Sequence, residues 1–412
     1  MARNRLRGDA PAVAQVDTFE ITAAGAAADE VEVVISNKSV VAVVPTSPTT
    51  ATVAAAVAEA CADSDHPEFR EVTWTSDGAD VYATATTPGT PFTISAVNVT
   101  GTVTASAVSN VTPSGGPNHW DDPLNWSAGT VPATGEDVDL QDLDVDVKWG
   151  LAQSGVTLAS LNLHSTFTGR LGLIPFNGSY YEYRATELAI GATLCVVGEG
   201  DGAGSPMIRL NTGSVQTNLR VKGTGAASAQ GQPAVWWRGT HASNAVVVTR
   251  GTVGLAYELG QAATLASLRV GSTGGLSDAV VWGGAGLSLT AHVQASGDVT
   301  LLNTVSTVVK NGGTLTLGGL AVAVTSIVGQ NGDINFDATG TVTTTDLFDG
   351  CTLVLDRDPR AGKTFTTLRL YAGSGLTDEN EVAAFTNPVQ VKCKLRQLKV
   401  FEIGADIAVQ RS

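Results

Sequence analysis

The chain has 412 residues, enough for two or three domains, and only 15% of them are charged. Its formal net charge of −15 argues against a general nucleic-acid binder, because phosphate binding needs clustered lysine and arginine. The abundance of Gly, Ala, Thr and Val is unlike a disordered chain and favours a mainly β protein with many tight turns.

No apolar run approaches the ~20 residues of a membrane-spanning helix, so we expect no membrane partner. Cys61, Cys195, Cys351 and Cys393 lie far apart and form no CxxC pair, which disfavours a zinc site. We interpret them as small buried hydrophobic residues and expect no cofactor.

Residues 1–15 form a basic arm on an acidic chain. Arg3, Arg5 and Arg7 supply its positive charge, and they predict docking onto an acidic neighbour. A disordered tail is the alternative. In either case we expect the rest of the chain to fold without the arm.

Residues 16–112 predict a small β-rich α+β domain. Apolar and polar residues alternate over Val16–Thr22 and Val31–Ser36, as in half-buried strands. Thr49 begins a helix over about residues 50–61, whose apolar side chains fall on one face. Three short strands separated by Gly-containing turns follow between residues 72 and 96.

Residues 113–140 predict a linker followed by a cap. Trp120 and Trp126 occur in a turn-rich segment that contains proline and cannot form a long regular element. Two large aromatic side chains there predict a plug over the end of an apolar core. An ordinary loop with two buried tryptophans is the alternative.

An alternating acidic segment follows the cap and slips by one residue at Gln141, which predicts a bulge or a turn between two strands. Asp142, Asp144 and Asp146 are candidate Ca²⁺ ligands, since Ca²⁺ prefers clustered oxygen atoms. No Asp-x-Asp-x-Asp-Gly loop accompanies them, so a solvated acidic face is the favoured interpretation.

Residues 141–371 carry a repeat that predicts a right-handed parallel β-helix. Apolar runs begin at Val299, Leu315, Ile334 and Leu353, at spacings of 16, 19 and 19 residues. That period is too short for a leucine-rich repeat or a propeller blade and fits one β-helix coil. Residues 372–412 predict the C-terminal cap, with an amphipathic strand over Val389–Lys399.

Rods of this type often trimerise, and we expect a homotrimer. Trp236, Trp237, Trp282 and Tyr181 are candidate contacts between chains. An internal aromatic stack or an isolated surface aromatic is the alternative for each residue.

Several segments resemble structural proteins of tailed bacteriophages. In the N-terminal part they are Gly8–Val16, Thr49–Ala60, Pro67–Phe69 and Gly89–Ser95, and in the body they are Tyr180–Arg184, Gly198–Ser205, Asn211–Val221 and Arg238–Asn244. The tryptophan segment resembles the N-terminal cap of parallel β-helices in bacterial and phage surface proteins. The resemblance implies attachment to other virion proteins, of the capsid or the tail, and implies no particular activity.

The sequence offers few catalytic candidates. Asp356 and Asp358 lie in a tight mixed-charge cluster, although a salt-bridged surface corner explains them equally well. We therefore expect a non-enzymatic virion structural protein, either a fibre or a capsid decoration. The alternatives are a tailspike that binds or degrades a host surface glycan, and a bacterial surface adhesin.

Overall fold

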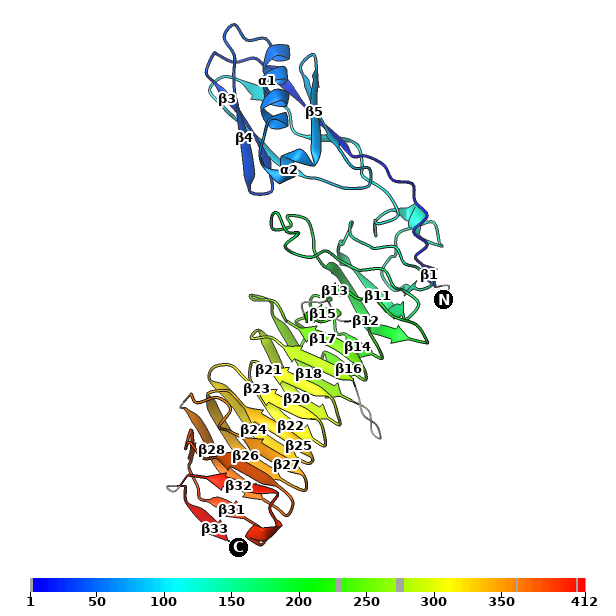
Figure 1. Cartoon of the computed structure of the whole chain (residues 1–412). Coiled ribbons are helices and arrows are strands. Elements are labelled where there is room, and N and C mark those ends of the chain that lie inside the picture. The colour runs from blue at the N-terminus through cyan, green and yellow to red at the C-terminus, as the bar shows by residue number, and fades with distance from the viewer. Residues whose placement is uncertain (1–2, 227–230, 272–277, 361, 405–406, 412) are drawn as a thin grey trace.

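The computed structural model describes residues 3–226, 231–271, 278–360, 362–404 and 407–411. The protein is mainly β, with a small module at one end of a long stack of strands (Figure 1). Two separate hydrophobic cores, one in each part, hold the buried apolar residues. No helix in the described ranges is both long and apolar enough to cross a membrane.

The N-terminal module (residues 16–112) contains two antiparallel sheets and two helices. Its strands are β2 (Val16–Ala23), β3 (Glu30–Ile35), β4 (Lys38–Val43), β5 (Val72–Asp77), β6 (Asp80–Ala85), β7 (Ile94–Thr100), β8 (Thr104–Ala105) and β9 (Ser109–Thr112), and its helices are α1 (Thr50–Ala62) and α2 (Pro67–Arg70). One sheet has the order β5-β6-β2 with β8 and β9 on β2, and the other has the order β4-β3-β7.

Helix α1 begins where the sequence predicts. The Thr49 hydroxyl accepts a hydrogen bond from the Thr52 backbone N–H, and the Thr52 side chain accepts one from the Thr49 N–H. This capping box satisfies two backbone donors that a helix start leaves unpaired. Val53, Val57 and Cys61 lie on the buried face and join the core of the module.

The rest of the chain forms one parallel sheet. In the described residues it contains 25 strands, β1 and β10 to β33. From β12 to β28 each strand pairs with the strand two positions further along, as expected if successive coils stack on one another. The arrangement is compatible with a parallel β-helix.

These strands and the 3-10 helices near the two ends of the rod have the following bounds: β1 (Asn4–Arg5), η1 (Pro123–Asn125), β10 (Asp137–Leu140), β11 (Ala152–His164), β12 (Leu188–Glu199), β13 (Ile208–Asn211), β14 (Asn218–Val221), β15 (Val235–Arg238), β16 (Ala245–Val248), β17 (Gly251–Leu255), β18 (Ala263–Val270), β19 (Ala279–Gly283), β20 (Leu287–Gln294), β21 (Asp298–Leu301), β22 (Val305–Lys310), β23 (Thr314–Leu317), β24 (Val322–Gly329), β25 (Gly332–Phe336), β26 (Gly340–Leu347), β27 (Cys351–Val354), β28 (Lys363–Leu370), β29 (Gly375–Asp378), β30 (Ala383–Phe385), β31 (Val389–Val391), η2 (Leu395–Gln397), β32 (Val400–Ile403) and β33 (Val409–Arg411).

The repeat found in the sequence corresponds to the register of the stack. Val299 pairs with Leu315, Leu315 with Ile334, and Ile334 with Leu353. All four side chains are buried in the rod core. The spacing of the apolar runs therefore gives the length of successive coils directly.

The N-terminal arm is part of the rod and is not the disordered tail that the sequence left open. Strand β1 pairs in parallel with β10, and Leu6 bridges to Trp126. Leu6 is buried in the rod core, so the arm covers the first coil. Removing the arm would expose both an apolar surface and a strand edge.

The C-terminal end differs from the predicted amphipathic strand over Val389–Lys399. Only β31 is extended, and η2 follows it, because the chain turns to begin a further coil at β32. Leu395, Leu398 and Phe401 are partly buried against the end of the core. All four cysteines are free, and Cys393 is the one that is half-buried rather than buried.

Candidate functional site

The largest irregular excursion near the start of the rod is the segment 173–187, called the tyrosine loop here. It leaves the stack after Leu171, which bridges to Ile208, and rejoins it at β12. The Asn177 side chain closes the tip by accepting hydrogen bonds from the backbone N–H groups of Ser179 and Tyr180, each 3.0 Å long. Asn commonly stabilises a turn in this way.

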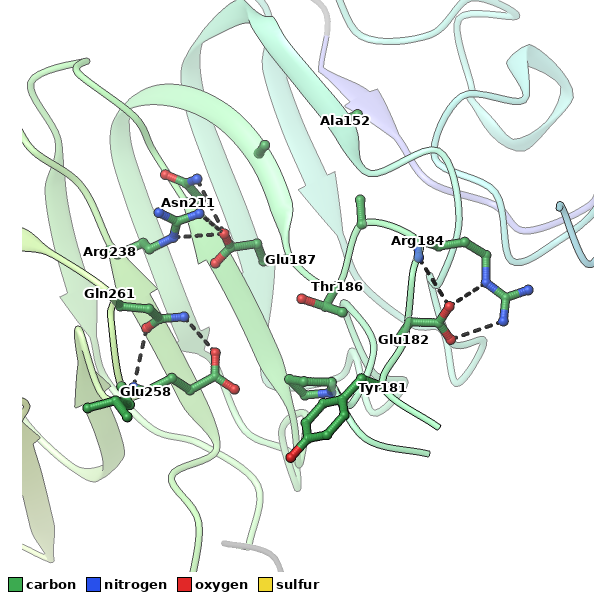
Figure 2. A pocket seen from close by; sticks show the side chains of 14 residues that line it. Ala152, Tyr181, Glu182, Arg184, Thr186, Glu187, Asn211, Arg238, Glu258 and Gln261 are labelled. Carbon is green, nitrogen blue, oxygen red and sulfur yellow. Dashed lines mark hydrogen bonds and ion pairs between the residues drawn. The ribbon is translucent and has the colours of Figure 1, made fainter. Parts of the chain in front are cut away.

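A polar pocket of about 600 Å³ lies between the tyrosine loop and the rod (Figure 2). Glu187 Oε1 accepts hydrogen bonds from Arg238 Nε at 2.7 Å and from Asn211 Nδ2 at 3.3 Å. Asn211 and Arg238 are register partners on β13 and β15, so the stacking of two coils places them together. The sheet thus positions the two side chains that hold Glu187.

A second pair occupies the far side of the same pocket. Glu258 Oε2 accepts hydrogen bonds from Arg209 Nη2 at 2.7 Å and from Gln261 Nε2 at 2.6 Å. Arg209 is only 2% exposed, and its guanidinium lies 4.2 Å from the ring centroid of Trp236. Arginine stacks well on an aromatic face, and the ion pair with Glu258 compensates the buried positive charge of Arg209.

An apolar cavity of about 850 Å³ adjoins the polar pocket. Ile174, Phe176 and Trp236 contribute to its wall, together with Met207. Pro175 and Glu258 line both cavities, so the two adjoin, and together they are called the groove. It combines a polar half and an apolar half, as ligand sites commonly do.

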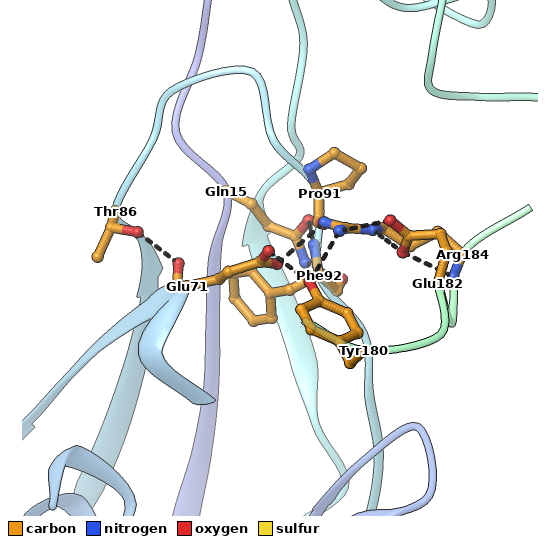
Figure 3. Close-up of polar contacts among 8 residues, drawn as sticks. All are labelled: Gln15, Glu71, Thr86, Pro91, Phe92, Tyr180, Glu182 and Arg184. Carbon is orange, nitrogen blue, oxygen red and sulfur yellow. Dashed lines mark hydrogen bonds and ion pairs between the residues drawn. The ribbon is translucent and has the colours of Figure 1, made fainter. Parts of the chain in front are cut away.

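A network of half-buried residues connects the tyrosine loop to the N-terminal module (Figure 3). Arg184 Nη1 donates to Glu71 Oε2 at 3.1 Å and to the Pro91 carbonyl at 2.9 Å, and Tyr180 Oη donates to Glu71 Oε1. Arg184 Nε donates to Glu182 Oε1 at 2.6 Å. We call these residues the Arg184 network.

Aromatic rings enclose the Arg184 network. The Arg184 guanidinium lies 4.6 Å from the ring centroid of Trp149 and 4.7 Å from that of Tyr183. Burial, reinforced by the Glu71 carboxylate, raises the pKa of Tyr180 above its ordinary value, so its hydroxyl stays protonated and can donate. The network joins the module to the rod beside the groove.

The tryptophan cap has the predicted placement. Trp120 and Trp126 are both buried, with ring centroids 4.8 Å apart in an edge-to-face arrangement. Trp126 Nε1 donates to the Trp120 carbonyl at 2.7 Å, and Leu6 from the arm completes the cap. The edge-to-face arrangement of the two rings is favourable, because the positive edge of one aromatic ring meets the negative face of the other.

The three arginines of the arm lie on one exposed face, because they alternate with the buried side chains of Asn4 and Leu6. Arg3 Nη1 forms an ion pair of 3.3 Å with Asp139. Asp139 is buried, which corrects the expectation of a solvated acidic face at this position. Arg5 and Arg7 line the same shallow depression as Arg3.

The four aromatic residues predicted to form contacts between chains have different surroundings. Trp237 is buried in the rod core, so the prediction of an inter-chain contact is wrong for this residue. Trp236 is buried against Arg209 and its edge meets Tyr257, whose ring also meets Trp282. Tyr181 is 78% exposed at the rim of the groove.

The acidic candidates have structural partners. Asp356 accepts hydrogen bonds from the Glu379 and Asn380 backbone N–H groups and thereby holds a turn. Asp358 is bonded to Arg360, which lowers the pKa of Asp358 to about 2. A carboxylate with so low a pKa cannot act as a general acid near neutral pH.

The candidate Ca²⁺ ligands do not gather. Asp142 occupies a left-handed turn with φ of 52°, which accounts for the slip in the acidic segment. Asp144 is exposed, and Asp146 pairs with Lys148 at 3.2 Å. Among the described residues, no group of three His, Cys, Asp or Glu side chains could hold a metal ion.

Comparison with protein-family models, with curated proteins and with solved structures gave no match.

Proposed function

We propose that this chain is a non-enzymatic structural protein of a tailed-phage virion, of the fibre or head-decoration type. In this proposal the N-terminal module and the arm attach to the particle, and a right-handed parallel β-helix projects from it. The observation that carries the proposal is the continuous join between module and rod. The Arg184 network ties the two parts together, and a backbone bridge between Val13 and Gly115 joins the two segments that connect them.

The attachment partners are other virion proteins, of the capsid or the tail. The exposed face of Arg3, Arg5 and Arg7 supports this, because it is a cationic strip at the module end of an acidic chain. Contacts of exposed charges weaken with salt, since screening acts over about 8 Å at physiological ionic strength.

The decisive test replaces the three arginines by glutamine, which keeps the strand pairing of the arm and the buried contacts of Leu6 but removes the ion pair of Arg3 with Asp139, so thermal unfolding must first show that the variant is folded. A matched control replaces the exposed Arg220, Arg250 and Arg269 in the rod. We expect the arm variant to be lost from purified particles and the rod variant to be incorporated normally. Equal incorporation of both variants would remove the arm from the attachment site.

We further propose that the rod is a homotrimer. Leu302 and Leu320, 43% and 73% exposed, follow the paired strands β21 and β23 and offer exposed apolar side chains for such a contact. Light scattering should give three times the mass of one chain, and replacing both leucines by serine should lower that mass. A monomer at all concentrations would refute the trimer.

A carbohydrate-degrading tailspike is the second candidate, and the groove with its two glutamates is the observation that favours it. Glycoside hydrolysis needs one carboxyl group that can donate a proton. Glu187 and Glu258 are instead each bonded to an arginine, an arrangement suited to accepting hydrogen bonds. Release of shorter oligosaccharides from a host polysaccharide by the purified protein would reverse this preference.

A further inference from the structure

We propose that the groove binds a neutral oligosaccharide. This inference does not depend on the assignment to a virion, because it rests on the groove alone. It requires that the groove is preformed, that its charges balance, and that it offers both hydrogen-bonding groups and apolar surface.

The polar groups of the groove are held in place before any ligand arrives. Arg238 and Asn211 both bond to Oε1 of Glu187, and Arg209 and Gln261 both bond to Oε2 of Glu258. In each glutamate the other carboxylate oxygen is the acceptor that a ligand hydroxyl would meet. Side chains fixed in this way lose little conformational entropy when a ligand binds.

The charge balance selects the class of ligand. Three of the four arginines that line the groove are paired with a glutamate, Arg238 with Glu187, Arg209 with Glu258 and Arg184 with Glu182, and the fourth is the exposed Arg170, so the charges of the groove nearly balance. A phosphate or a sulfate would meet carboxylates, and a cation would meet guanidinium groups. Sugar hydroxyls donate and accept at once, so a neutral polyol can use the acceptors and the amide donors together.

Apolar surface lies beside the polar groups. Tyr181 and Leu259, both strongly exposed, line the polar pocket, and Ile174 and Phe176 line the adjoining cavity. The C–H faces of sugar rings can pack on such side chains while their hydroxyls reach the glutamates. Because two cavities of about 600 and 850 Å³ adjoin, an extended ligand fits better than a single sugar.

The probe is an array of neutral oligosaccharides built from hexoses and N-acetylhexosamines, with sulfated and uronic-acid oligosaccharides beside them. The best neutral binder is then titrated by calorimetry against Tyr181→Ala and Glu258→Gln. Glu402→Gln is the matched control, because Glu402 is exposed on β32, in the last coils. Unchanged thermal unfolding verifies that each variant is folded.

We expect binding to neutral oligosaccharides, a loss of affinity of at least tenfold in both groove variants, and no change in the control. Mass spectrometry should recover the bound oligosaccharide intact. The proposal is overturned if no neutral oligosaccharide binds, if only the acidic ones bind, or if the groove variants bind as tightly as the control. Cleavage of the oligosaccharide would contradict the claim of binding alone.

Discussion

Replacing Arg184 by alanine should release the N-terminal module from the rod. The substitution removes hydrogen bonds to Glu71, Glu182 and the Pro91 carbonyl and the stacking on Trp149. The side chain of Glu182 is only 4% exposed, so its charge would stay buried without its cationic partner, held only by the backbone N–H of residue 184. Breaking one partner out of a buried pair costs about 3–5 kcal/mol.

That cost should appear at the junction and not in the two cores, because the module and the rod have separate cores. Small-angle scattering should show a broader distribution of sizes for Arg184→Ala, and limited proteolysis should cut faster between residues 112 and 118. For Arg184→Lys both measurements should fall between those of the wild type and Arg184→Ala, since lysine keeps the charge but loses the planar contacts of arginine.

Arg220→Ala is the control, because Arg220 is exposed on β14. It should leave both the scattering profile and the proteolysis rate unchanged. If Arg184→Ala also matches the wild type in both measurements, the network does not hold the module and the reasoning fails.

Three further predictions concern stability. Trp126→Ala should lower the free energy of unfolding by about 3–5 kcal/mol in denaturant titrations, since it empties the buried cap. Leu6→Ala should cost about 2–5 kcal/mol in the same assay, and deleting residues 1–15 should cost more, because β10 also loses its partner strand. Burial lowers the pKa of His292 to about 4, below the 6.5 of an unfolded chain. The unfolded chain then binds the extra proton between these values, so stability should fall by about 3 kcal/mol as pH drops from 6.5 to 4.

Each stability prediction has an outcome that would contradict it. A loss below 1 kcal/mol in Trp126→Ala would show that the tryptophan is not a cap, and wild-type stability of Leu6→Ala would show that the arm is dispensable. For His292 the informative quantity is the difference between wild type and His292→Gln across the pH range, because the carboxyl groups titrate in both. A constant difference would mean that the histidine is not buried in its neutral form.

The sequence predicted those features that depend on local pattern. The helix start at Thr49 follows from capping chemistry, and the register of Val299 and Leu315 follows from the spacing of the apolar runs. The different environments of Trp236 and Trp237 could also have been predicted from the sequence, because adjacent side chains on a strand point to opposite faces. One of the two therefore had to face the core.

The groove could not be predicted, because it depends on contacts between distant segments. Glu187 and Arg238 are 51 residues apart, and Arg209 and Glu258 are 49 apart. Their meeting depends on the lengths of the intervening coils, which vary with the turns and insertions between strands. The docking of the arm spans 136 residues between Arg3 and Asp139, with no signal in either local pattern.

The central claim is attachment to a particle through the N-terminal end, and cross-linking mass spectrometry of purified particles tests it most directly. A lysine-reactive cross-linker would report on Lys38 in the module and on Lys392 and Lys394 in the last coils. The account predicts cross-links from Lys38 to other particle proteins, and links from Lys392 and Lys394 only to copies of this chain. Links to particle proteins from the last coils alone, or absence of the chain from purified particles, would contradict it.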